Sequence, residues 1–61
     1  MSQLTATSAA LTENTNNIAS NMMSIGQNTS MITANMGSIK DNEDMISNNM
    51  NTIGLNTGMI G

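Results

Sequence analysis

Aliphatic residues recur at a constant spacing of seven positions along the whole chain. The nine members of this stripe are Leu4, Leu11, Ile18, Ile25, Ile32, Ile39, Ile46, Ile53 and Ile60. An asparagine stands three positions after each member from Leu11 to Ile53. These seven residues are Asn14, Asn21, Asn28, Asn35, Asn42, Asn49 and Asn56. A heptad with distinctive first and fourth positions is typical of the a and d positions of an α-helical coiled coil.

The heptad pattern predicts an all-α fold in which residues 1–61 form one continuous coiled-coil segment. A repeat of about 3.5 residues per turn is slightly below the ~3.6 of a straight helix, so the helices should form a left-handed supercoil. Isoleucine at a, polar layers at d and methionines at e and g broaden the interface beyond two helices. We therefore expect a parallel, in-register homotrimer.

Size and composition also favour self-association. The chain has 61 residues and no aromatic residue, proline, cysteine or histidine. A chain this short rarely stabilises a core of its own. Methionines flank the predicted seam, with Met22, Met36 and Met50 at e and Met31, Met45 and Met59 at g. They are expected to pack beside the seam, although methionine also suits an adaptable surface for another protein.

The main alternative to a helix is a β-solenoid. The sequence also repeats every fourteen residues, over 21–34, 35–48 and 49–61, and asparagine, threonine, serine and glycine make up about half of it. These residues form helices poorly, so an isolated peptide should be largely unfolded. A solenoid of fourteen-residue turns would present flat polar faces suited to ice or glycan binding. The strict alternation that strands require is missing.

Several functional classes lack the residues they need. A net charge of −3 with one lysine provides no basic surface for nucleic acid. The longest apolar run, residues 9–11, is far shorter than the roughly 20 residues of a membrane helix. Without histidine or cysteine there is no poised acid–base or nucleophilic group, so the chain is not expected to be an enzyme.

Four of the five charged residues gather in one stretch, Lys40-Asp41-Asn42-Glu43-Asp44. Clustered carboxylates attract hard cations, but the glycine and the later glutamate of a calcium loop are missing here. We interpret the stretch as a solvated helix face with weak ion pairs three or four residues apart. No cofactor or metal site is expected.

Three heptads resemble a known motif. They are Leu11-Thr12-Glu13-Asn14-Thr15, Ile25-Gly26-Gln27-Asn28-Thr29 and Ile53-Gly54-Leu55-Asn56-Thr57. They are similar to the I-x-x-N-T-x-x heptads of the trimeric coiled-coil stalks in bacteriophage tail fibres and trimeric autotransporter adhesins. The resemblance implies that Asn14, Asn28 and Asn56 hold axial chloride ions and that Thr15, Thr29 and Thr57 brace them. The other asparagines are weaker candidates, because Met follows Asn21, Asn35 and Asn49, and Glu43 follows Asn42.

The resemblance implies a non-enzymatic structural stalk or fibre. A chain that begins at Met1 without an export signal favours a phage tail or another virion appendage, assembled inside the cell and in contact with other virion or fibre proteins. The alternative is an adhesive module, either an adhesin-like stalk on an extracellular surface or the ice- or glycan-binding solenoid.

Overall fold

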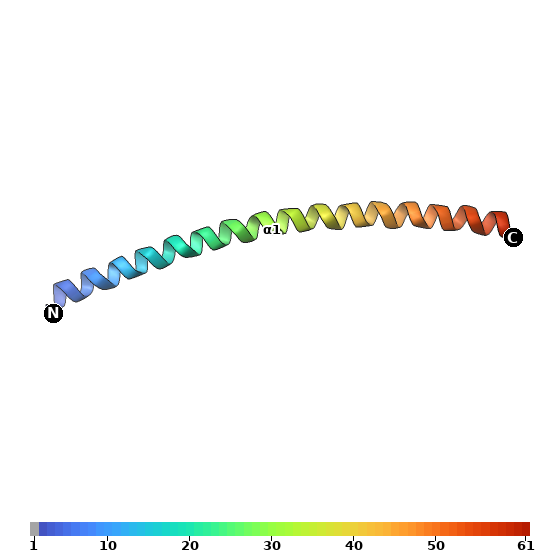
Figure 1. Ribbon diagram of the computed structural model, residues 1–61. Helices are drawn as coiled ribbons and strands as arrows, with labels where there is room; N and C mark the ends of the chain where they lie inside the picture. The colour runs from blue at the N-terminus through green and yellow to red at the C-terminus, as the bar shows by residue number, and fades with distance from the viewer. Residues whose placement is uncertain (1) are drawn as a thin grey trace. The chain divides into compact units, whose positions relative to one another are not determined.

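The computed structural model describes residues 2–61, and it contains one element, the α-helix α1, Gln3–Ile60 (Figure 1). None of the described residues belongs to a strand. The prediction of an all-α chain is therefore confirmed, and the β-solenoid alternative is wrong for residues 2–61. The reason is periodicity: a spacing of seven keeps apolar residues on one face of a helix, whereas strands need alternation.

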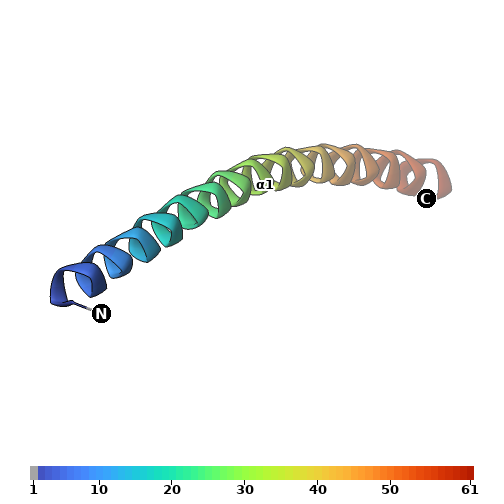
Figure 2. The same cartoon turned by 60° about the vertical axis from the view of Figure 1, so that its left-hand side comes forward.

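The backbone of α1 is regular despite a composition that disfavours helices. Proline is absent from the sequence, so no turn loses a hydrogen-bond donor. No described residue, glycine included, has a positive φ or a cis peptide bond. The helical turns therefore follow one another without a break from Gln3 to Ile60 (Figure 2).

Ser2 caps the N-terminus of α1. The first amides of a helix have no carbonyl partner within it, and a serine oxygen just before the helix can accept from one of them. Here the Thr5 amide donates to the Ser2 Oγ at 3.1 Å, and the Ala6 amide donates to the Ser2 carbonyl at 3.0 Å. The Ser2 and Thr5 hydroxyl oxygens also lie 2.8 Å apart. The helix start is thus set by local side-chain chemistry.

The contacts along the chain separate two units, one extending to Met31 and the other being Ile32–Gly61. Every described residue of both units is exposed to solvent, and none forms a core. A helix of poor intrinsic propensity that buries nothing lacks the tertiary packing from which most helices gain their stability. Packing within the described residues therefore adds no stability to this helix.

Replacing Gly37 by alanine should stabilise the helix. A Cβ built at Gly37 meets nothing within 4 Å, and position f lies on the outer face of the predicted coiled coil. Alanine loses less conformational freedom than glycine on folding, so each chain should gain about 0.5–1 kcal/mol. The thermal midpoint followed by circular dichroism measures this gain. The reverse change at an outer c position, Ala34→Gly, should lower the midpoint by a similar amount. A lower midpoint for Gly37→Ala would mean that this face is closely packed.

Candidate functional site

The stripe of aliphatic side chains is the main apolar feature of α1. Residues seven apart differ by only about 20° around a straight helix, so in each unit these side chains share one face. Their exposed fractions range from 56% at Ile39 to 88% at Ile60. Monomeric proteins rarely expose long contiguous apolar surfaces, and those that do generally use them as interfaces. The a-position stripe is therefore the candidate functional site.

The d-position asparagines lie beside this stripe, and all seven are exposed. In residues 2–61, no hydrogen bond joins any of these seven carboxamides to another side chain or to the backbone. Each carboxamide carries two N–H donors and an acceptor oxygen. The face thus presents alternating levels of aliphatic surface and of hydrogen-bonding groups.

The three threonines of the resembling heptads share one geometry. The hydroxyls of Thr15, Thr29 and Thr57 donate to the carbonyls of Leu11, Ile25 and Ile53, at 2.9, 2.9 and 2.8 Å respectively. Each acceptor is the a residue one turn earlier. A threonine in a helix has two accessible χ1 rotamers, and this bond selects one of them. The hydroxyls are therefore held against the backbone of the a residues, next to the asparagines that the resemblance implicates.

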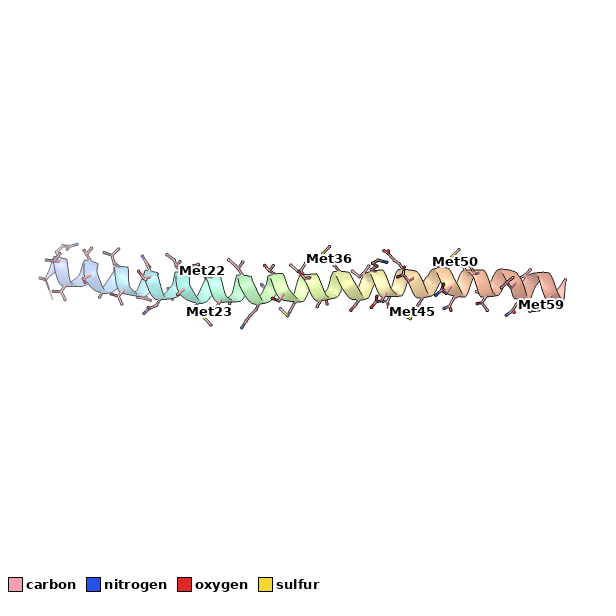
Figure 3. All side chains as sticks on the ribbon, turned by 90° about the horizontal axis from the view of Figure 1, so that it is seen from above. Met22, Met23, Met36, Met45, Met50 and Met59 are labelled. Carbon is pink, nitrogen blue, oxygen red and sulfur yellow. The ribbon has the colours of Figure 1, made fainter. Side chains whose placement is uncertain are left out.

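The methionines of positions e and g lie on either side of the stripe. In Ile32–Gly61, Met36 and Met50 project to one side of the helix, and Met45 and Met59 project to the other (Figure 3). All four are exposed, Met45 least at 55%. Since methionine is unbranched and polarizable, these side chains can close over an apolar seam from both edges.

The charged stretch contains one ion pair, between Lys40 at position b and Asp44 at position f, on the outer face of the predicted heptad. Lys40 Nζ lies 3.1 Å from Asp44 Oδ2, in the i,i+4 arrangement expected for this segment. Both side chains remain mostly exposed, so the pair contributes only a few tenths of a kcal/mol. No group of three acidic, histidine or cysteine side chains within residues 2–61 is arranged to hold a metal ion.

Over the part of the chain that the structure describes, no pocket is found, and no helix is long and apolar enough to cross a membrane. The chain matches no family model, and no curated protein or solved structure is significantly similar to it. The exposed faces of α1 are therefore the candidate functional surfaces.

Two structural features of the helix are not part of the heptad pattern. The Ser2 cap was signalled by a serine just before the first apolar residue of the repeat, with Thr5 three positions later. Thr12 and Thr52 also donate to carbonyls one turn earlier, those of Ser8 and Asn48, both at 3.1 Å. Neither threonine belongs to the asparagine–threonine motif. The back-bond is thus a general property of threonine in this helix.

Proposed function

We propose that the chain is a non-enzymatic structural segment, a stalk or fibre in which three parallel copies of α1 coil around a common axis. The aliphatic a layers hold the helices together by excluding water. The asparagine d layers select the strand number at some cost in stability, as single buried asparagines do in other coiled coils. The function is mechanical: to span a distance and resist bending.

One observation carries this proposal: all nine a-position side chains are more than half exposed on a helix that has no core of its own. Full burial of one leucine or isoleucine is worth roughly 1.5–3 kcal/mol relative to exposure. Copies of the same chain offer the matching stripe at the same spacing. Self-association therefore buries every a residue at once, which an unrelated globular partner would not do.

The resemblance of three heptads to stalk motifs supports assignment to a phage tail or another virion appendage. Such a segment joins other fibre or virion proteins at its ends and carries no catalytic group. The adhesin-like stalk is the same architecture in another setting. No feature of the helix favours the solenoid-type binding module over this assembly.

Sedimentation equilibrium with far-ultraviolet circular dichroism tests the proposal. We expect a helical species with three times the 6.4 kDa chain mass. Dilution should unfold the helix and dissociate the trimer together, because the helix is stabilised only within the assembly. A monomer that stays helical on dilution would refute the proposal.

We also propose that the Asn14, Asn28 and Asn56 layers bind chloride on the axis. Three carboxamides at one level supply N–H donors around a point, and the neighbouring threonines have their hydroxyls held by backbone carbonyls. The Asn42 layer is different, because Glu43 adds a negative charge beside each carboxamide. An anion should avoid that level.

Chloride removal should lower the stability of the assembly. A ligand that binds only the folded state stabilises it by about 2.7 kcal/mol at a concentration one hundred times its Kd. We expect a higher thermal midpoint in sodium chloride than in sodium sulfate of equal ionic strength. A variant without the Asn14, Asn28 and Asn56 layers corrects for the general effect of each salt on stability. Asn28→Ala should reduce the chloride dependence, and the control Asn42→Ala should retain it. Equal chloride dependence in both variants would exclude binding at the Asn28 layer.

A further inference from the structure

The a and d positions do not by themselves define the axial register of the assembly. Aliphatic residues recur at every a position, and asparagines at every d position from Asn14 to Asn56. If one helix slides by a heptad, aliphatic layers still meet aliphatic layers and amide layers still meet amide layers. Only one layer of each kind is lost at the end. Something other than the seam must disfavour this slip.

In Ile32–Gly61, the residue types at positions e and g repeat every fourteen residues and not every seven. In Ile32–Gly61 the e positions are Met36, Glu43, Met50 and Thr57, and the g positions are Ser38, Met45, Thr52 and Met59. Methionine therefore alternates with a polar residue on both edges. Figure 3 places Met36 and Met50 on one edge and Met45 and Met59 on the other.

We infer that two methionine rows, Met36 with Met50 and Met45 with Met59, form an interface between copies of this chain. These rows set the axial register of the interface. In a parallel coiled coil, a g residue lies beside the e residue of the next heptad in the neighbouring helix. In register, Met45 then meets Met50 of the next copy. Thr52 meets Thr57, and Ser38 meets Glu43. Apolar side chains pair with apolar ones, and polar side chains pair with polar ones.

A slip of one heptad reverses this matching. Met45 would meet Glu43 or Thr57, and Thr52 would meet Met50. Each methionine side chain would lose its apolar partner, and a carboxylate or hydroxyl would be brought against apolar surface at a desolvation cost. A slip of two heptads restores the methionine pairs but leaves two aliphatic and two amide layers uncovered. The register without slip is the one that satisfies both patterns.

The parallel orientation of the helices is set by the residues at a and d and not by those at e and g. In an antiparallel arrangement each a residue packs at the level of a d residue of its neighbour, so isoleucine would face asparagine throughout. Parallel helices instead keep aliphatic and amide levels separate. The inference rests on the proposed function, because it concerns how the copies of the stalk align.

Cysteine cross-linking tests the register, and the chain has no cysteine of its own. Three double cysteine variants report three alignments, and all of them contain Met45→Cys. The second change is Met50→Cys for the matched register, Glu43→Cys for a slip of one heptad and Met36→Cys for a slip of two heptads. Mild oxidation should yield a covalent trimer on a non-reducing gel only for the first. The outer-face control Leu55→Cys should yield none.

A second measurement leaves the methionine rows intact. A spin label on Leu55→Cys in an otherwise unchanged chain should give one short inter-label distance, because the three labels lie at one level. A one-heptad slip would separate labels along the axis by about 10 Å. A longer distance between the labels would overturn the inference. The inference would also be overturned if all three double variants cross-linked equally, or if none of them cross-linked in an assembled trimer. A monomeric wild-type chain would instead refute the stalk itself.

Discussion

Ile39→Asn should abolish assembly and, with it, the helix. In the proposed trimer one substitution changes three side chains of the same layer, and truncating a buried isoleucine costs about 2–5 kcal/mol. The loss per trimer is therefore about 6–15 kcal/mol, the size of the whole stability of a typical domain. The new amides would also join the Asn35 and Asn42 layers to make three consecutive polar levels. Circular dichroism and sedimentation mass should both report an unfolded monomer.

The matched control is Leu55→Asn. It makes the same kind of change, aliphatic to amide, at Leu55, which is 70% exposed in the single helix. Its c position would stay exposed in the proposed trimer. Substitutions at such positions usually alter stability by less than about 0.5 kcal/mol. If Leu55→Asn were as damaging as Ile39→Asn, the interface would not follow the predicted stripe.

Asn35→Ile should have the opposite effect and raise the stability of the assembly. Replacing a buried polar group by an apolar one removes its desolvation cost, and burial of each isoleucine adds about 1.5–3 kcal/mol. Three copies give a gain of about 4.5–9 kcal/mol per trimer. The urea midpoint should rise accordingly. The outer-face control Asn51→Ile should leave the midpoint nearly unchanged.

The same substitution should weaken the control of strand number. Isoleucine at both a and d permits trimers and tetramers, whereas a polar layer excludes most alternatives. We therefore expect a mixed mass distribution when Asn35, Asn42 and Asn49 are all replaced by isoleucine. A single trimeric species in that variant would show that the asparagines do not select the strand number.

Most of the helix could be predicted because its signal is periodic and long. The spacing from Leu4 to Ile60 never slips, and a regular helix converts spacing directly into faces. Ion pairs three or four residues apart were expected in the charged stretch, and the structure shows one between Lys40 and Asp44 at 3.1 Å. Such features depend only on residues within one or two turns of each other.

The threonine hydroxyls were harder to predict. Thr29 was expected to brace Asn28, and the structure directs its hydroxyl to the carbonyl of Ile25 at 2.9 Å. Sequence places both partners within reach, but the choice depends on a χ1 rotamer that the backbone geometry selects. The brace on the asparagine stays a prediction for the assembled chain.

The sequence alone determined which side chains share a face, because a spacing of seven assigns every aliphatic residue to one stripe of a helix. It predicted a helix and kept the solenoid as the alternative, because asparagine, threonine, serine and glycine disfavour a helix locally while the long-range repeat favours it. The three-dimensional structure decided between them: α1 continues through Gly26, Gly37, Gly54 and Gly58 with no positive φ. An amide-rich repeat can form either structure, and only the backbone conformation shows that the aliphatic residues of each unit are exposed on a helix.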